Sequence, residues 1–248
     1  MADASSAGHH HEHAHGHAHD HSHGGKDLAD FNRDYFDENA DKYDEMPGAI
    51  ELTTKVANAM LKKFKFDEDS TVVMDYACGT GLISRILAPH SKKIVGVDIS
   101  QGMVNRYNLR VSNQGIPPEE MQAVRLELKG EEGELDGTKF DVIVCSMAYH
   151  HFPDIDDTTR ILVNFLKPGG RLMVADLLKN ESGSMLIPEK HQHVFERHGY
   201  APEDLRTVFE KQGLTNFEWE QVAEFKMHGM DGKTLLAVAT KPAVSAAL

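Results

Sequence analysis

The most constraining feature of this sequence is an apolar strand that runs into a glycine-bearing turn, followed by a second apolar strand that ends on an acid. The first strand is predicted over 71–76, and its turn carries Gly79 and Gly81. The second is predicted over 93–98 and ends at Asp98. A strand, a glycine turn and a helix in this order are typical of a nucleoside-containing cofactor site at the edge of a parallel sheet.

The charges near the turn decide which cofactor the pattern favours. Gly79 and Gly81, followed by Ser84, also fit a dinucleotide site, and a tight turn in an unrelated α/β protein is a further alternative. Asp75 ends the first strand four residues before Gly79, so its carboxylate is expected beneath the turn. A pyrophosphate would meet a like charge there, whereas S-adenosylmethionine carries an ammonium, a sulfonium and no phosphate. Backbone N–H groups of the following helix would bind its carboxylate, and Asp98 its ribose hydroxyls.

Three segments carry a family resemblance: 72–81 together with Asp98, 140–152, and 166–174. They resemble class I S-adenosylmethionine-dependent methyltransferases, in the small-molecule branch that contains the ubiquinone and menaquinone methyltransferases. The likeness covers residues 30–242. The resemblance and the residues above predict a cofactor site formed by Tyr43, Asp75, Ala77, Cys78, Gly79, Thr80, Gly81, Asp98, Ile99, Met103 and Cys145.

Two positions depart from the family pattern. Ala77 replaces the first glycine of the motif, and we expect a negative φ there, which alanine tolerates. At the end of the third strand, where the family often has an acid beside the adenine, this chain offers Leu128-Lys129-Gly130. Any adenine contact at that point would come from the backbone, or the register of the strand is shifted.

Strands that alternate with helices predict a parallel, doubly wound sheet. We expect an α/β, Rossmann-like, mostly parallel seven-stranded sheet flanked by helices, with a C-terminal antiparallel hairpin. The other expected strands are 122–128, 140–146, 171–177, 216–227 and 233–240, the last two joined across Asp231-Gly232. Pro47 is expected to open a helix with Ile50, Thr54, Ala57, Leu61 and Phe64 at helical spacing.

The expected domain organisation has four parts. Residues 1–25 would be a disordered histidine-rich tail, 26–46 an N-terminal lid, 47–242 the methyltransferase domain and 243–248 a C-terminal tail. In the lid, Tyr43 and Tyr35 would pack on the methionine portion of the cofactor, where a cation–π contact with a sulfonium contributes roughly 0.5–2 kcal/mol. The alternative is that these aromatic residues only hold the first helix against the sheet.

His150 and His151 follow the fourth strand and are the predicted catalytic residues, one of them as a general base or a group that orients the acceptor. The alternative is that one caps the turn and the other lies on the surface. After the fifth strand, further candidates for acceptor binding are His191, His193 and His198. Nearby apolar residues suggest an acceptor wall, with ordinary core as the alternative: Met185, Leu186, Ile187 and Phe195.

Nine histidines crowd the N-terminal tail, mostly at every second position. At this density imidazoles bind Ni²⁺, Zn²⁺ or Cu²⁺, so the predicted metal ligands are His9, His10, His11, His13, His15, His17, His19, His21 and His23. The alternative is a disordered tail with no selected metal function. No metal is expected in the core, because Asp176 is a lone acid after the fifth strand.

Composition limits the remaining function classes. A formal charge of −13 argues against nucleic-acid binding, and no apolar run approaches the roughly 18 residues of a membrane span. The two cysteines, Cys78 and Cys145, are expected to be small buried residues in a reducing compartment, which favours a cytoplasmic location. Neither the acceptor nor the oligomeric state is predicted.

The sequence thus favours methyl transfer from S-adenosylmethionine to oxygen, sulfur or carbon of a small, partly apolar molecule. Two alternatives stay open. The first is a protein methyltransferase on the same core, and the second is a metal-handling protein that uses the tail and keeps the fold as a cofactor-binding scaffold.

Overall fold

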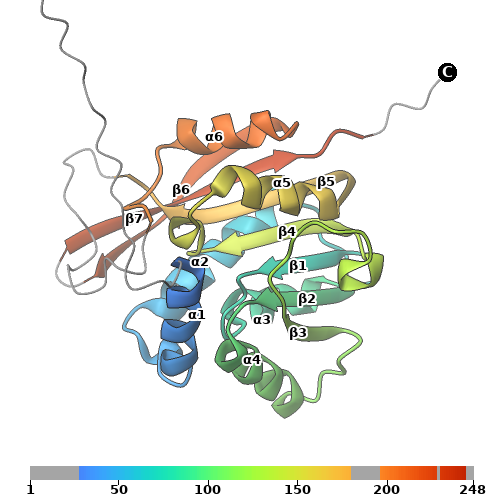
Figure 1. The fold of residues 1–248 in the computed structure, drawn as a ribbon, viewed down its shortest axis with the longest axis vertical. Helices are drawn as coiled ribbons and strands as arrows, with labels where there is room; N and C mark the ends of the chain where they lie inside the picture. The colour runs from blue at the N-terminus through green and yellow to red at the C-terminus, as the bar shows by residue number, and fades with distance from the viewer. Residues whose placement is uncertain (1–27, 180–195, 228–229, 244–248) are drawn as a thin grey trace, which may run out of the picture.

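The computed structural model describes residues 28–179, 196–227 and 230–243. Its strands are β1 Val72–Tyr76, β2 Lys93–Asp98, β3 Met121–Arg125, β4 Phe140–Ser146, β5 Leu166–Leu177, β6 Thr215–Met227 and β7 Met230–Thr240. They form one sheet in the order β3-β2-β1-β4-β5-β7-β6 (Figure 1). The first five strands pair in parallel, and β7 pairs antiparallel with β5 and β6. The predicted fold, including its antiparallel hairpin, is confirmed.

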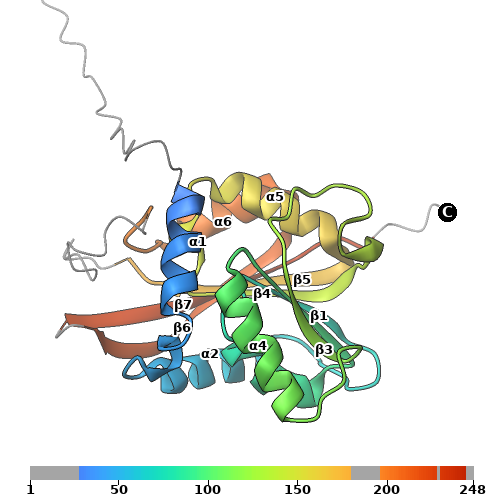
Figure 2. The ribbon, with the colours of Figure 1, turned by 60° about the horizontal axis from the view of Figure 1, so that its bottom comes forward.

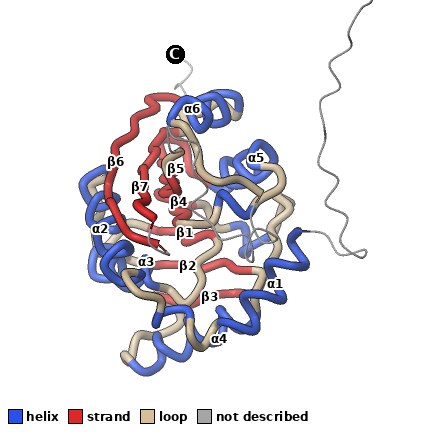
Figure 3. The backbone as a smooth tube through the Cα atoms, turned by 90° about the vertical axis from the view of Figure 1, so that its left-hand side faces the viewer, coloured by secondary structure: helices blue, strands red, loops and turns tan. Residues whose placement is uncertain are grey.

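Helices cover both faces of the sheet (Figure 3). They are α1 Leu28–Asn39, α2 Ala49–Lys63, α3 Leu82–Leu87, α4 Gln101–Asn113, α5 Ile155–Phe165 and α6 Pro202–Lys211, with single 3₁₀ turns at Tyr43–Glu45, Ala88–His90, Glu134–Gly137 and Tyr149–His151. Residues of α2, α3 and α4 form a hydrophobic core with one face, and residues of α5 and α6 form a second core with the other. This double coverage explains why the central strands are apolar without alternation.

The centre of the sheet positions the site. β1 and β4 are neighbours, and the chain continues from β1 toward β2 on one side and from β4 toward β5 on the other. At such a switch point the loops diverge beyond the carboxyl ends of the strands, where ligands bind in open α/β sheets. Helix α1 lies beside α4 and runs across this edge of the sheet (Figure 2).

Three details of the predicted elements are wrong. Asp231-Gly232 is not the hairpin turn but lies inside β7, where Gly232 pairs with Phe225 of β6. A Cβ on Gly232 would lie 2.4 Å from the Phe225 ring, so packing and not turn geometry requires the glycine. β5 begins at Leu166, five residues earlier than expected. β3 ends at Arg125, three residues earlier than expected.

Candidate active site

The turn after β1 has a backbone conformation that only a few residue types adopt easily. Ala77, Gly79 and Gly81 all have positive φ, at 55°, 52° and 83°. The expectation of a negative φ for Ala77 is therefore wrong, and a left-handed non-glycine residue costs on the order of 1–3 kcal/mol. A Cβ on Gly81 would lie 2.6 Å from the ring of Tyr107, whereas a Cβ on Gly79 would meet nothing within 4 Å. The turn is thus packed on its α4 side and open at Gly79.

Met147, after β4, repeats this conformation with a φ of 54°. Its N–H donates to the carbonyl of Ala175 over 2.8 Å, which holds the loop against the neighbouring strand. Since β1 and β4 are adjacent, Ala77 and Met147 are two strained backbone positions on opposite sides of the switch point. Strain of this kind persists where the surrounding structure enforces it, and it concentrates at binding sites.

Asp98 is held rigidly at the end of β2. Its Oδ2 accepts a hydrogen bond from Gly79 N over 2.8 Å, and its Oδ1 accepts one from Ser100 N over 2.9 Å. Burial raises the pKa of Asp98, and these N–H groups oppose that rise. The side chain of Ser100 also caps α4 by accepting from Met103 N over 3.1 Å. One carboxylate therefore joins the glycine turn to the start of α4 and retains acceptor capacity for a ligand.

Asp75 lies beneath the turn, as predicted, but is not part of the cavity surface. It is buried, and its Oδ2 accepts a 2.6 Å hydrogen bond from the hydroxyl of Ser84. Burial raises its pKa to about 7, with the nearby Asp98 carboxylate adding to the rise. The negative charge that was predicted to favour a cationic ligand therefore lies on a buried carboxyl group, and its ionisation depends on pH.

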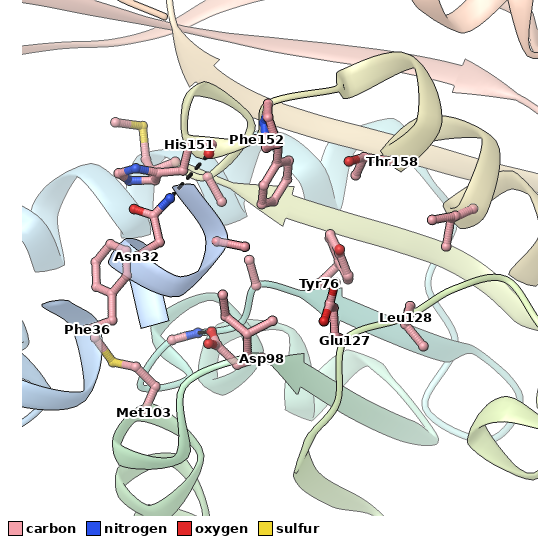
Figure 4. A pocket seen from close by; sticks show the side chains of 18 of the residues that line it. Asn32, Phe36, Tyr76, Asp98, Met103, Glu127, Leu128, His151, Phe152 and Thr158 are labelled. Carbon is pink, nitrogen blue, oxygen red and sulfur yellow. Dashed lines mark hydrogen bonds between the residues drawn. The ribbon is translucent and has the colours of Figure 1, made fainter. Parts of the chain in front are cut away.

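A cavity of about 270 Å³ opens at this edge of the sheet (Figure 4). Its walls come from α1, from the turns after β1, β2 and β4, from the segment after β3 and from the start of α5. Six predicted cofactor residues line it: Tyr43, Ala77, Gly79, Asp98, Ile99 and Met103. The others lie behind the wall and shape the turn or the core: Asp75, Cys78, Thr80, Gly81 and Cys145. Both cysteines are free and buried.

At one end of the cavity, Tyr76, Glu127 and Leu128 lie together, with Asp98 nearby (Figure 4). Sequence reasoning missed Glu127, because it assumed that β3 continued to residue 128. Since β3 ends at Arg125, the acid sits in the segment that lines the cavity. A search of the two residues on either side of the expected strand end would have found it. We call this part, with Asp98, Glu127 and Leu128, the nucleoside end, after the predicted position of the cofactor's nucleoside.

The opposite end is formed by α1 and the turn after β4. His151 lines the cavity there, and its ring meets the ring of Phe36 edge-on with a centroid distance of 5.3 Å. The amide of Asn32 donates from Nδ2 to the carbonyl of His151 over 3.3 Å. We call this part, with Asn32, Phe36 and His151, the acceptor end, after the predicted catalytic role of His151. Asn32 was not among the predicted site residues.

Both predicted catalytic histidines are buried, so the alternative with one of them on the surface is wrong: His150 is 3% exposed and His151 is 8% exposed. His150 does not line the cavity. Its Nδ1 lies 2.6 Å from Oδ1 of the fully buried Asp176, because β4 and β5 are parallel neighbours whose ends meet at this edge. The two imidazole rings lie 4.2 Å apart between centroids. His151 thus faces the cavity, and the His150–Asp176 pair lies behind it.

Two carboxylates hold the segment that contains α1 and the Tyr43–Glu45 turn over the site. Oδ1 of Asp37 accepts hydrogen bonds from the Ser100 hydroxyl, over 2.6 Å, and from Gly102 N, over 2.8 Å. Asp44 accepts from the Thr80 hydroxyl over 2.5 Å and forms an ion pair with Arg110. Burial and the Asp98 carboxylate raise the pKa of Tyr43 to about 12, so its hydroxyl stays neutral. The predicted lid segment therefore covers the cavity; its movement remains a prediction.

Several predicted sites lie outside the described residues. They are the tail histidines, His191, His193 and the apolar wall Met185, Leu186, Ile187 and Phe195. His198 is described and is exposed. Within the described ranges, no group of three or more His, Cys, Asp or Glu side chains is arranged to hold a metal ion. In the same ranges, every helix is too short or too polar to span a bilayer.

Fold and cavity together define an α/β protein with a ligand-sized cavity at the switch point of its sheet. A family model described as "Methyltransferase domain" matches residues 28–218, and the chain belongs to that family. A crystal structure of magnesium protoporphyrin IX methyltransferase from Synechocystis PCC 6803 with bound SAH is similar in fold. Its TM-score is 0.65 at 17% identity, covering 86% of this chain and 99% of that one. The architecture is thus that of S-adenosylmethionine-dependent methyltransferases.

Two curated relatives are also named as methyltransferases. An uncharacterized methyltransferase of Schizosaccharomyces pombe is 39% identical over 181 residues, which cover 66% of this chain and 64% of that protein. A ubiquinone biosynthesis O-methyltransferase of Coxiella burnetii is 27% identical over 154 residues, covering 57% of this chain and 62% of that protein. The chain spans just under two thirds of the length of these relatives.

Proposed function

We propose that this chain is an S-adenosylmethionine-dependent methyltransferase that methylates oxygen, sulfur or carbon of a small, partly apolar molecule. The observation that carries the proposal is the shared cavity: Asp98, an acceptor for ribose hydroxyls, and His151, a candidate base, line the same space beneath α1. Family membership supports the reaction class. The apolar surroundings of His151, with Phe36 and Ala148, favour a partly apolar acceptor.

The residues present fit the cofactor. Asp98 and Glu127 bring two carboxylates to the nucleoside end, where they can accept hydrogen bonds from ribose hydroxyls. The open space at Gly79 allows a ligand to approach the backbone closely. When bound, S-adenosylmethionine supplies a methyl group already activated by a positively charged sulfur.

The remaining task of the protein is to position the acceptor, exclude water and accept a proton where the acceptor has one to lose. Phe36 and Tyr43 form an aromatic wall, with ring centroids 6.1 Å apart, that shields the cavity on the α1 side. His151 is the group placed to take the proton. The buried His150–Asp176 pair would hold the turn on which His151 lies.

The test is a product screen. Purified protein is incubated with S-adenosylmethionine and a panel of thiols, phenols and quinone precursors, and formation of S-adenosylhomocysteine is measured. We expect turnover with at least one panel member, and thermal stabilisation by S-adenosylhomocysteine alone. Tight binding of NADH, with no stabilisation by S-adenosylhomocysteine, would contradict the proposal.

Two further functions inferred from the sequence are kept as proposals. In the first, the tail binds Ni²⁺, Zn²⁺ or Cu²⁺; nine histidines support it, and deletion of residues 1–25 should abolish metal binding and preserve turnover. If deletion removes the main activity, the metal-handling alternative is favoured. In the second, the acceptor is a protein, and labelling of a peptide array with radioactive cofactor distinguishes it.

The free cysteines support a reducing, cytoplasmic location, and the formal charge of −13 supports the absence of a nucleic-acid partner.

A further inference from the structure

The side chain of Asn32, on the inner face of α1, is an unusual polar group in the acceptor end. It is 5% exposed and lines the cavity. Its Nδ2 donates to the His151 carbonyl, and this bond sets the orientation of the planar amide. The oxygen, Oδ1, is buried and accepts no hydrogen bond from any described residue. In Figure 4, Asn32 lies between Phe36 and His151.

A buried carbonyl oxygen without a donor is costly, at about 1–3 kcal/mol for an unsatisfied polar group. Buried polar groups in native proteins are nearly always paired, with protein, water or ligand. An unpaired acceptor in a cavity wall can therefore take its hydrogen bond from the N–H or O–H of a ligand. The bond to the His151 carbonyl fixes the Asn32 amide, so its Oδ1 can accept a hydrogen bond from a ligand in only one orientation.

The charges at this end favour a neutral donor. The described carboxylates of the cavity come from Asp98, Glu127, Asp154 and Asp157, at the ends of β2 and β3 and at the start of α5. Beside Asn32 in the wall are Ala29 and Phe36, one helical turn away on α1, and His151, and none of them carries a negative charge. Among the described residues that line the cavity, none beside Asn32 offers an ammonium group a counter-charge. Burying an ammonium without one is far more expensive than burying a hydroxyl.

We propose that Asn32 accepts a hydrogen bond from a hydroxyl group of the methyl acceptor, and that the enzyme selects acceptors with a hydroxyl on an apolar body. The inference rests on the proposed function, and it narrows the acceptor class. Asn32 is then a specificity-determining residue supplied by α1, next to His151. Because α1 covers the cavity, the same helix both closes the site and recognises the molecule inside it.

The test uses protein saturated with S-adenosylhomocysteine and two matched probes, 4-methylphenol and toluene, whose affinities are compared by ligand-observed NMR. Wild type should prefer the phenol by roughly tenfold, the size of one hydrogen bond to a buried acceptor. Asn32→Leu, which removes the acceptor oxygen at similar volume, should bring that preference close to one. If Asn32→Leu does not fold, Asn32→Ala should give the same loss.

The matched control is Asn39→Leu, on the same helix. The Asn39 side chain donates to the carbonyl of Tyr35 over 2.7 Å and does not line the cavity, so this variant should keep the full phenol preference. An unchanged preference in Asn32→Leu would overturn the inference. So would a tenfold loss of S-adenosylhomocysteine affinity in Asn32→Leu, since the donor would then be the cofactor's ammonium. Failure of wild type to bind S-adenosylhomocysteine would instead contradict the proposed function.

Discussion

The two ends of the cavity are built in different ways. The nucleoside end is built around the ends of two adjacent parallel strands. There the Asp98 carboxylate bonds to the N–H groups of Gly79, 19 positions away, and Ser100, two positions away. The acceptor end is assembled over long distances, since Asn32 and His151 are 119 positions apart and meet through one hydrogen bond.

This difference has a physical reason and a functional consequence. Backbone geometry holds the nucleoside end, so it can serve any acceptor without change. Side chains on α1 and on the turn after β4 form the acceptor end, and substitutions there are expected to alter specificity. We therefore expect substitutions at the two ends to separate cofactor affinity from turnover.

The largest expected effect is on turnover at the acceptor end. His151→Ala should lower kcat by roughly 10²- to 10⁴-fold, the usual contribution of a positioned acid–base group, while S-adenosylhomocysteine affinity changes little. The kcat is measured with an acceptor found in the product screen, and the affinity is measured by calorimetry with S-adenosylhomocysteine. His90→Ala, at an exposed histidine, is the control. Full activity of His151→Ala would remove His151 from the mechanism.

The next effect concerns pH and the carboxylate beneath the glycine turn. The pKa of Asp75 is raised from 3.8 to about 7 in the folded protein, so the folded state keeps a proton that the unfolded chain has lost. The stabilisation linked to this proton is complete below the unfolded pKa and is lost as pH rises through about 7. The loss is on the order of 1–4 kcal/mol in the free energy of unfolding.

Asp75→Asn should remove this part of the pH dependence, because the amide oxygen still accepts from Ser84 and carries no charge. Urea unfolding at pH 4.5 and pH 7.5 measures it. Asp69→Asn, at an exposed carboxylate, should keep the wild-type dependence. An identical pH profile in Asp75→Asn and wild type would mean that Asp75 is ionised throughout.

A smaller effect is expected from Asp98→Ala at the nucleoside end. Loss of charge-assisted hydrogen bonds should weaken binding of S-adenosylhomocysteine by roughly 1–3 kcal/mol, measured by calorimetry. Asp69→Ala, at the same exposed position as above, should leave affinity unchanged. If Asp98→Ala reduced kcat and left affinity intact, the separation of the two ends would be wrong.

The smallest effect concerns backbone strain. Ala77→Gly should raise the free energy of unfolding by up to about 1 kcal/mol, because glycine adopts a positive φ without steric cost. Ala88→Gly, where φ is −54°, should be destabilising instead. Equal destabilisation by both substitutions in urea titrations would show that the left-handed conformation of Ala77 costs little.

Much of the nucleoside end could be predicted. Hydrophobic runs located β1, β2 and β4, and the glycine pattern located the turn, because strand and turn propensities act over a few residues. The φ of Ala77 could not be predicted, since contacts around the turn enforce it against the preference of alanine. Glu127 was missed because strand ends are among the least certain features of a sequence. Gly232 was misread because a close approach to Phe225 has the same sequence signature as a turn.

The amino-acid sequence alone determined the class of fold, the cofactor turn and the residue that ends β2, because each follows from local hydrophobic pattern and backbone freedom. Only the tertiary structure decided that Asn32 joins the site, that Asp176 pairs with His150 and that His151 faces the cavity. These placements depend on strand order and on how α1 crosses the sheet edge. Both bring together side chains that no local pattern connects.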